Sequence, residues 1–349
     1  MTWSRWMLVA VPASWLLAAL HAPPLAVFLV SGLAVIPLAA EMGAATETLA
    51  DRSGPAVGGL LNATFGNAAE LIIAIVALRA GLLDLVKASL TGSILGNLLL
   101  ILGLSLMAGG LKRSKLTFNQ TAAGMSGAML LLAVVGLAIP ALFVSTHPGA
   151  ATATAVHLSE GVALVLGATY VASLVFSLKT HRELFSPERA VSSTETHRTP
   201  AGRAVALLAG ATVLVAVQSE ILVHATEQVV SGTGISESFL GLIVIPLIGN
   251  AAEHATAVVV ARKGDTDLAL TIALGSSTQV ALFVAPVLVL AGVLVGQPMS
   301  LVFTPFEIVS LGLAALIVTV IALDGESHWF EGAQLLAVYA ILAIAAWFV

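Results

Sequence analysis

The sequence is a succession of apolar runs, most of them about twenty residues long, separated by short clusters of glycine, proline and charged residues. A run of that length matches one helical crossing of a lipid bilayer. Of the 349 residues, 58% are hydrophobic and 9% are charged, whereas a soluble domain carries about 25% charged residues. The chain is therefore predicted to be an all-α polytopic membrane protein without a large soluble domain.

Turn and charge clusters divide the chain into eleven expected spans. They lie near 6–20, 24–49, 54–79, 83–108, 118–143, 155–178, 203–229, 237–261, 266–295, 304–323 and 330–348. The first span is interpreted as a helix rather than a signal peptide, because Leu20-His21-Ala22 before Pro23 makes a poor cleavage site.

The distribution of basic residues favours this number of spans, because Lys and Arg accumulate on the cytoplasmic side. Eleven spans leave only Arg79 and Lys87, of the 14 basic residues, on the side opposite the N-terminus. The other basic residues are Arg5, Arg52, Lys112, Arg113, Lys115, Lys179, Arg182, Arg189, Arg198, Arg203, Arg262 and Lys263. We therefore expect the N-terminus in the cytoplasm and the C-terminus outside, in a prokaryotic plasma membrane given the short loops.

The chain contains an internal duplication. "GNAAELIIAIVALRAGLLDLVKASLTGS" at 66–93 aligns without a gap with "GNAAEHATAVVVARKGDTDLALTIALGS" at 249–276. Five helices in each copy would insert the second copy with the opposite orientation, which is typical of secondary transporters. The expected organisation is an N-terminal transmembrane helix (1–22), a first five-helix repeat (23–178), a cytoplasmic linker (179–203) and a second repeat (204–349).

Both copies of the motif place Gly-Asn just before a glutamate inside an apolar span. Unwound backbone at membrane depth is tolerated where it lines a cavity or is buried in protein. Freed carbonyls, amide oxygens and carboxylates are hard ligands, and Ca²⁺ takes six to eight of them. The repeats thus predict one cation site near the bilayer midplane. Its candidate ligands are Gly66, Asn67, Glu70, Gly249, Asn250 and Glu253.

Further polar groups follow in the next span of each half. Ser93 and Ser276 correspond in the alignment, and Asn97 and Gln279 are nearby amides at non-equivalent positions. All four are candidate ligands, although small-residue helix packing explains the serines equally well. The candidates for coupling to protons are Glu70, Glu253, Glu47, Glu227 and His254. Each motif alone could also be a glycine packing site with a paired glutamate.

The absence of cysteine excludes disulfides and thiolate metal sites. Of the soft ligands, only the imidazole of His254 lies beside a motif. The expected partners are ions and the lipid bilayer, and no nucleic acid. A homo-oligomer is compatible with the sequence.

The paired GNAAE motifs, "VKASLTGSILGNLLLILG" at 86–103, "LKTHRELF" at 178–185 and eleven spans resemble the calcium/proton antiporter (cation/proton exchanger) family. The resemblance implies Ca²⁺ export driven by H⁺ entry, without a cofactor and without enzymatic activity. It also implies that Glu70 and Glu253 are the central carboxylates, supported by Ser276 and Gln279. One departure concerns the linker, where Glu183, Glu188 and Glu195 are outnumbered by basic residues although relatives often carry an acidic helix.

Two carboxylates near the midplane must each be neutralised by a cation or a proton. One Ca²⁺ or two protons would neutralise both carboxylates. A site that changes its accessible side only when its carboxylates are neutralised would therefore exchange Ca²⁺ for protons. Three alternatives remain open at this point. The same fold could exchange Na⁺ for Ca²⁺, or could exchange Mg²⁺ or Mn²⁺ for H⁺. A passive channel could use the same carboxylates. Finally, "GMSG" at 124–127 matches a rhomboid-like intramembrane serine protease with Ser126 as nucleophile.

Overall fold

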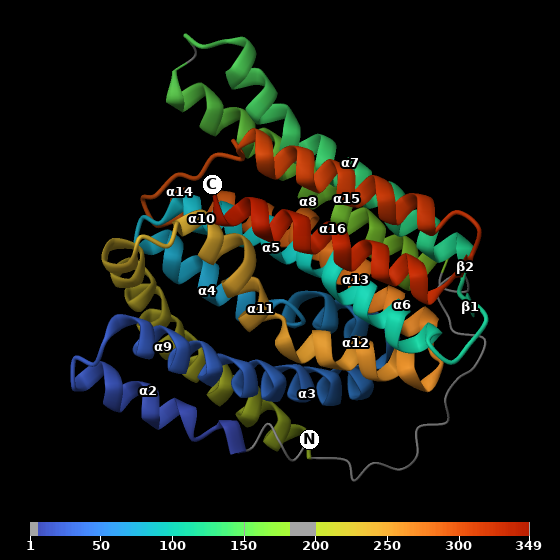
Figure 1. The fold of residues 1–349 in the computed structure, drawn as a ribbon, viewed down its shortest axis with the longest axis horizontal. Coiled ribbons are helices and arrows are strands. Elements are labelled where there is room, and N and C mark those ends of the chain that lie inside the picture. Colours follow the sequence, from blue (N-terminus) through green and yellow to red (C-terminus); the bar gives the residue numbers. More distant parts are fainter. Residues whose placement is uncertain (1–5, 150, 182–199, 349) are drawn as a thin grey trace. The chain divides into compact units, whose positions relative to one another are not determined.

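A computed structural model describes residues 6–149, 151–181 and 200–348 of the chain. These residues are almost entirely helical (Figure 1). Most of the predicted linker lies outside the described residues. Contacts between Cα atoms divide the chain into two compact units: Met1–Val76 with Val171–Gly232, and Ala77–Tyr170 with Thr233–Val349. Each unit therefore combines segments from both halves of the sequence.

Unit 1 is built from long helices and one kink. Its elements are α2 (Ala10–Ala19), α3 (Pro24–Phe65), most of α4 (Ala68–Arg79), η2 (Phe176–Thr180) and nearly all of α9 (Ala201–Thr233). Within α3, Gly54 has φ 78° and ψ 168°, so two helices meet at a sharp corner there. Glycine fits because this left-handed φ carries no Cβ penalty. The first helix of the pair, Pro24–Gly54, is long and apolar enough to span a membrane.

Helices α2, α3 and α9 share one apolar core, and Figure 1 shows α2 and α3 running side by side. A buried polar contact also joins α2 to α9. Gln218, which is fully buried, donates from Nε2 to the Ser14 hydroxyl over 2.8 Å, and its Oε1 accepts from the Trp15 indole over 3.2 Å. A buried amide needs such partners, so this contact fixes the register of α2 against α9. The core residues are Val11, Ala34, Leu38, Met42, Ala68, Ala69, Ala211 and Val215.

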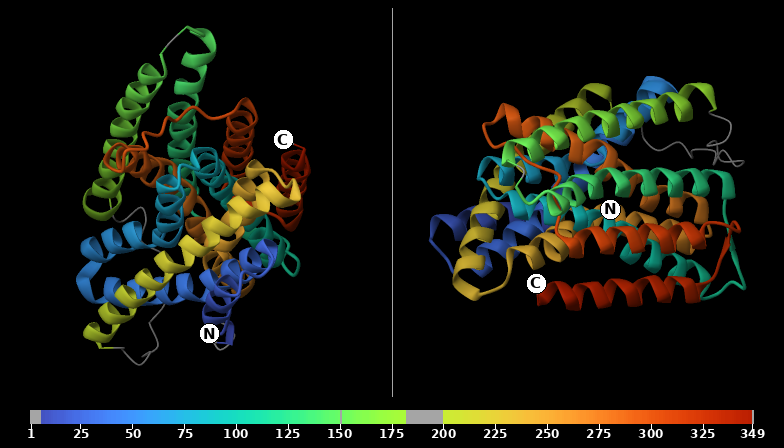
Figure 2. Two further views of the ribbon diagram at one scale, coloured as in Figure 1. Left: turned by 90° about the vertical axis from the view of Figure 1, so that its left-hand side faces the viewer. Right: turned by 90° about the horizontal axis from the view of Figure 1, so that it is seen from above.

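Unit 2 packs its helices around a buried central span, and Figure 2 shows its long helices lying alongside one another. Its first half contains α5 (Leu83–Leu95), η1 (Gly96–Ile101), α6 (Leu102–Gly110), β1 (Leu116–Thr117), α7 (Gln120–Thr146) and most of α8 (Thr152–Val175). Its second half contains α10 (Glu237–Phe239), η4 (Leu240–Val244), α11 (Ile245–Gly249), α12 (Ala251–Lys263), α13 (Thr266–Gln279), η5 (Val280–Val284), α14 (Ala285–Leu294), α15 (Pro305–Ile321), β2 (Glu326–Ser327) and α16 (Trp329–Trp347).

The central span of unit 2 runs from Leu83 to Gly110, and 83% of its most apolar window is buried. It meets the second half at Gly92, where a Cβ would lie 2.2 Å from the carbonyl oxygen of Leu242 and 2.7 Å from the Pro246 ring. Only a glycine permits this approach of two backbones. Near the other end of the span, β1 pairs with β2 in a short antiparallel ladder.

The described residues contain seven helices long and apolar enough to cross a membrane, and up to nine if each of two bent helix pairs counts as one span. Two shorter apolar helices, Ala10–Ala19 and Pro305–Ile321, lie where the first and tenth spans were predicted. The architecture is thus the predicted all-α polytopic one, and it is consistent with eleven spans.

Two acidic residues after α15 have defined partners. Glu326 lies in β2 and pairs with Lys115 over 2.5 Å. Glu331 lies in the first turn of α16, where Oε2 accepts from the Ser327 hydroxyl over 2.6 Å. The carboxylate of Glu326 therefore pairs with a lysine beside the strand, and the carboxylate of Glu331 caps α16.

Candidate cation site

Both copies of the repeated motif lie at a break in a membrane-length helix pair. The pair Val57–Phe65 and Ala68–Arg79 bends by 43°, and the pair Glu237–Gly249 and Ala251–Lys263 bends by 62°. Gly66 and Asn67 occupy the first break; at the second, Gly249 ends α11 and Asn250 occupies the break. The predicted interruption of the helix at Gly-Asn is therefore present in both copies.

The two breaks restart the helix in the same way. The carbonyl of Asn67 accepts from the Leu71 amide over 3.0 Å, and the carbonyl of Asn250 accepts from the His254 amide over 2.9 Å. Glu70 and Glu253 consequently fall in the first turns of α4 and α12. The partial positive charge of a helix N-terminus stabilises a carboxylate at that position.

In unit 2, Glu253 is held by a serine from the following helix. The hydroxyl of Ser276 donates to Oε2 of Glu253 over 2.6 Å. Ser276 is only 6% exposed, whereas Glu253 is half-buried. A hydroxyl bound to a carboxylate forms a short, charge-assisted hydrogen bond. The bond fixes the orientation of the carboxylate.

Asn250 is joined to the central span of unit 2. Its Nδ2 donates to the Ser93 hydroxyl over 3.3 Å, and both side chains are buried. One helical turn later, Asn97 Oδ1 lies 3.3 Å from His254 Nε2. The residues drawn together around α12 thus come from both sequence repeats, although they belong to one unit.

The helices that carry these polar groups are locally widened. A π-helical turn, η1, contains Asn97, and another, η5, follows Gln279 directly. The alignment of the repeats places Val280, the first residue of η5, opposite Asn97. Extra residues in a helical turn re-aim side chains and are frequent at functional sites. The shared widening supports a common role for the two positions.

Unit 1 holds the remaining candidates. Asn67 is buried and Glu70 is half-buried, next to the apolar core of that unit. Glu47 lines a cavity of about 440 Å³ together with Asp51 and Asn62. Its other lining residues are Ala50, Gly54, Gly58 and Gly59. Glu227 instead lies 3.6 Å from His224 on the same helix, so its carboxylate already has a partner.

Within the described part of the chain, no three His, Cys, Asp or Glu side chains gather around a potential metal position. The other candidate ligands are amide, hydroxyl and backbone carbonyl oxygens. Ca²⁺ accepts such neutral oxygens readily.

One buried carboxylate was not predicted from the sequence. Glu307 is 6% exposed and accepts from the amide and the hydroxyl of Thr304, each over 2.8 Å, and from the Thr91 hydroxyl over 3.4 Å. The signal was present as Thr-Pro-Phe-Glu at 304–307, which is a capping-box pattern. The protease alternative gains nothing from the structure, where the Ser126 hydroxyl donates to the Ala122 carbonyl of its own helix.

The chain matches the sodium/calcium exchanger protein family over residues 23–179 and 203–348. It is 47% identical to a Ca²⁺/H⁺ antiporter of Synechocystis over 92% of this chain and 91% of the relative. It is 45% identical to the Ca²⁺/H⁺ antiporter ChaA of Bacillus subtilis over 96% of this chain and 95% of the relative. The solved structure of native YfkE superposes with a TM-score of 0.85 at 42% identity and covers 98% of both chains.

Proposed function

The chain belongs to the sodium/calcium exchanger protein family, and from that premise we propose that it exports Ca²⁺ against H⁺ entry through a site centred on the helix break at Asn250. The protein exchanges Ca²⁺ for H⁺, as its relatives of 43–47% identity over nearly the whole chain do. The substrates are the two ions, and relatives of this kind are transporters rather than enzymes.

The observation that carries the site is the bond between Ser276 and Glu253 at this break. Candidate oxygen ligands lie close together in this part of unit 2. They are Glu253 Oε1, the carbonyl oxygen of Asn250 and the hydroxyl oxygen of Ser93. When Ca²⁺ binds, the carboxylate and these neutral oxygens replace part of the hydration shell of the ion. When a proton binds to Glu253 instead, the carboxyl is neutral and the affinity for Ca²⁺ is lost. Mutually exclusive binding to one carboxylate is the physical basis of exchange.

Glu70, Asn67 and Gly66 receive the equivalent role from the sequence repeat and from the matching break in their own helix pair. Gly249, Asn97 and Gln279 complete the proposed ligand set. As proposed for Glu253, the binding of Ca²⁺ and the binding of a proton to Glu70 would exclude one another. The organisation into repeats at 23–178 and 204–349 is supported by the two separate family matches.

We assign Glu47 to the route of the ions rather than to their final site. Its carboxylate lines the cavity in unit 1 with Asp51 and Asn62, at the corner where the first half of the broken helix pair begins. Two carboxylates on a cavity wall raise the local concentration of a divalent cation. Glu227 lies 3.6 Å from His224 and does not line this cavity, so it is a weaker candidate than Glu47.

The proposed orientation places the N-terminus in the cytoplasm and the C-terminus outside, in a prokaryotic plasma membrane. Because the chain lacks cysteine, single cysteines at exposed loop positions test this directly. Ser114→Cys should be protected from an impermeant thiol reagent in intact cells, and Pro298→Cys should be labelled. The reverse pattern would invert the orientation and leave the exchange function untouched.

The decisive experiment is reconstitution in liposomes with an imposed pH gradient. Ca²⁺ flux should follow the gradient in the wild-type protein and be lost in Glu253→Gln. Glu331→Gln, which neutralises a carboxylate at the cap of α16, is the control. Ca²⁺ flux that ignores the gradient would indicate a channel. Competition by Na⁺, Mg²⁺ and Mn²⁺ separates the remaining alternatives, since hard-oxygen sites distinguish these ions by cavity size and rigidity.

A further inference from the structure

Helices α6 and α12 of unit 2 end side by side. They cross so closely that a Cβ on Gly109 would lie 3.0 Å from the carbonyl oxygen of Ala261. Helix α6 ends at Gly110 and α12 at Lys263, where Gly264 adopts a left-handed φ of 100°. The terminal carbonyls of α6 and α12, with their partial negative charge, therefore lie close together at this end of unit 2.

Arg113 uses its charge to join the two helix ends. Its Nη1 donates to the Gly109 carbonyl over 2.7 Å, and its Nη2 donates to the Arg262 carbonyl over 3.4 Å. A side chain at Gly264 would collide with this guanidinium, because a Cβ there would lie 2.9 Å from Nη2. Arg113 is therefore engaged in holding the two helix ends together, and it fixes the backbone that carries the neighbouring basic residues.

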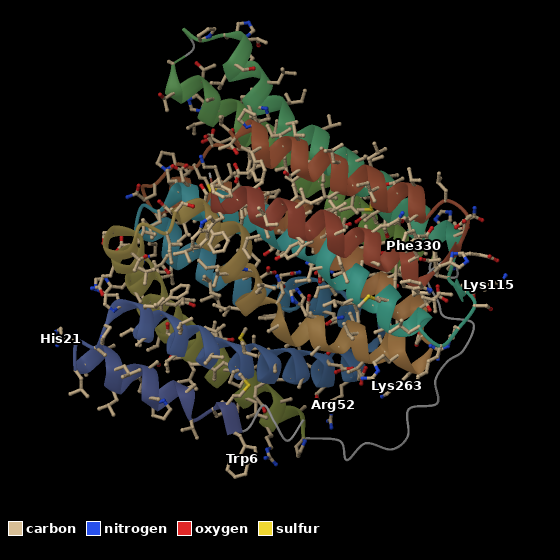
Figure 3. All side chains as sticks on the ribbon, viewed as in Figure 1. Trp6, His21, Arg52, Lys115, Lys263 and Phe330 are labelled. Carbon is tan, nitrogen blue, oxygen red and sulfur yellow. The ribbon has the colours of Figure 1, made fainter. Side chains whose placement is uncertain are left out.

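The neighbouring acidic groups have other partners. Asp265 accepts from the Leu268 amide over 3.0 Å, Asp267 accepts from the Asn119 amide over 2.5 Å, and Glu326 pairs with Lys115 over 2.5 Å. The side chains of Lys112, Arg262 and Lys263 are exposed, and no described carboxylate lies within ion-pair distance of them. Figure 3 shows Lys115 and Lys263 on the same side of unit 2.

An apolar residue accompanies these charges. Leu111 is 64% exposed directly before Lys112 and directly after the buried span Leu83–Gly110. An exposed leucine at a span end contacts acyl chains, while the long basic side chains beside it extend toward the headgroups. This end of unit 2 therefore presents apolar surface and unpaired positive charge at the depth where a phospholipid changes from tail to headgroup.

We propose that Lys112, Arg262 and Lys263 form a binding site for the headgroup of an anionic phospholipid. The phosphate accepts hydrogen bonds from the guanidinium of Arg262 and from the two ammonium groups. Because α12 carries Glu253 in its first turn and Arg262 and Lys263 in its last, about 15 Å away by helix rise, the lipid anchors the helix that bears the cation site. The site does not depend on the proposed exchange function.

The test measures lipid binding to the purified full-length protein by calorimetry. The probes are short-chain phosphatidylglycerol, short-chain phosphatidylcholine and glycerol 3-phosphate. We expect phosphatidylglycerol to bind more tightly than either of the other two. Each of the single substitutions Lys112→Gln, Arg262→Gln and Lys263→Gln should weaken phosphatidylglycerol binding about fivefold, as expected for about 1 kcal/mol per basic residue.

Lys115→Gln is the matched control, since it removes one positive charge from the same surface but one that is already paired with Glu326. Lys112→Arg with Lys263→Arg should retain binding, and thermal unfolding checks that every variant is folded. The proposal is overturned if the triple Gln variant binds phosphatidylglycerol like the wild type, or if Lys115→Gln weakens binding as much as Lys263→Gln does. It is equally overturned if glycerol 3-phosphate binds as tightly as the lipid.

Discussion

The hydroxyl of Ser276 donates a hydrogen bond to Oε2 of Glu253 over 2.6 Å, and this single contact joins the first turn of α12 to the buried end of α13. The two residues are 23 positions apart, on helices that pack along each other within unit 2. The next residue, Ser277, is also buried but donates to the Ala273 carbonyl of its own helix over 2.9 Å. Two adjacent serines therefore have different consequences for the carboxylate.

Ser276→Ala should weaken Ca²⁺ binding. The substitution removes a hydrogen bond to a charged group, worth about 1.5–3 kcal/mol, and leaves the carboxylate free to turn away from the ion. We expect the apparent affinity for Ca²⁺ in the flux assay to fall at least about tenfold. Ser277→Ala is the control, and its Ca²⁺ affinity should stay near that of the wild type. Equal losses in both variants would show that the serines act only through packing.

Ser93 and Asn250 should behave as a coupled pair. Asn250 donates to Ser93 across two helices, so removing either partner leaves the other buried group to find a new one. A double-mutant cycle with Ser93→Ala and Asn250→Ala should give a coupling energy of about 0.5–3 kcal/mol in Ca²⁺ binding. Additive effects of the two substitutions would contradict a shared role at the break.

Gly92→Ala should disrupt unit 2. Its Cβ would approach the backbone of Leu242 to 2.2 Å, and neither backbone can move without shifting the broken helix. Overpacking costs about 1–3 kcal/mol and occasionally more, so thermal unfolding in detergent should occur at a clearly lower temperature. Gly275 is the equivalent position in the second repeat, and a Cβ there would meet no described atom of another helix within 4 Å. Gly275→Ala should therefore unfold at about the wild-type temperature, and a loss of equal size there would refute the packing explanation.

The affinity for Ca²⁺ should fall as the pH falls. A proton on Glu253 neutralises the ligand, so protons and Ca²⁺ compete for the same oxygens, and the competition is strongest in acid. Calorimetric measurement of Ca²⁺ binding at a series of pH values should show this decrease in the wild type. The double variant Glu253→Asp, Glu70→Gln has one titrating carboxyl fewer, so the affinity of any residual Ca²⁺ binding should depend less steeply on pH. An affinity that is constant from neutral to acidic pH would contradict exchange at these carboxylates.

Calcium should also stabilise the folded protein. An ion that binds only the native state raises the free energy of unfolding by mass action, so the unfolding temperature should rise with Ca²⁺ concentration and return when the ion is chelated. Glu253→Gln should show little of this shift, whereas Glu331→Gln, altered at the cap of α16, should show all of it. A shift of full size in Glu253→Gln would place the stabilising ion elsewhere.

The class of fold follows from the sequence alone, because long apolar runs with few charges leave no alternative to membrane helices. The positions of the helix breaks follow as well, since Gly-Asn recurs inside two such runs and glycine weakens a helix wherever it stands. The family resemblance rests on the same residues. These conclusions depend on local composition and spacing, which a linear chain displays directly.

Which polar groups meet depends instead on the packed helices. Ser93 and Ser276 are equivalent in the alignment, yet Ser276 binds the carboxylate of its own repeat and Ser93 receives a hydrogen bond from Asn250, 157 residues away. That contact exists because Gly92 lets α5 approach the backbone at Leu242, and such a distance between backbones is a property of packed surfaces, not of sequence spacing. The hydrogen bond from Thr91 to Glu307 and the bond from Arg113 to the Arg262 carbonyl arise for the same reason. The side-chain partners depend on helices far apart in the chain, so the folded structure alone brings them within hydrogen-bond distance.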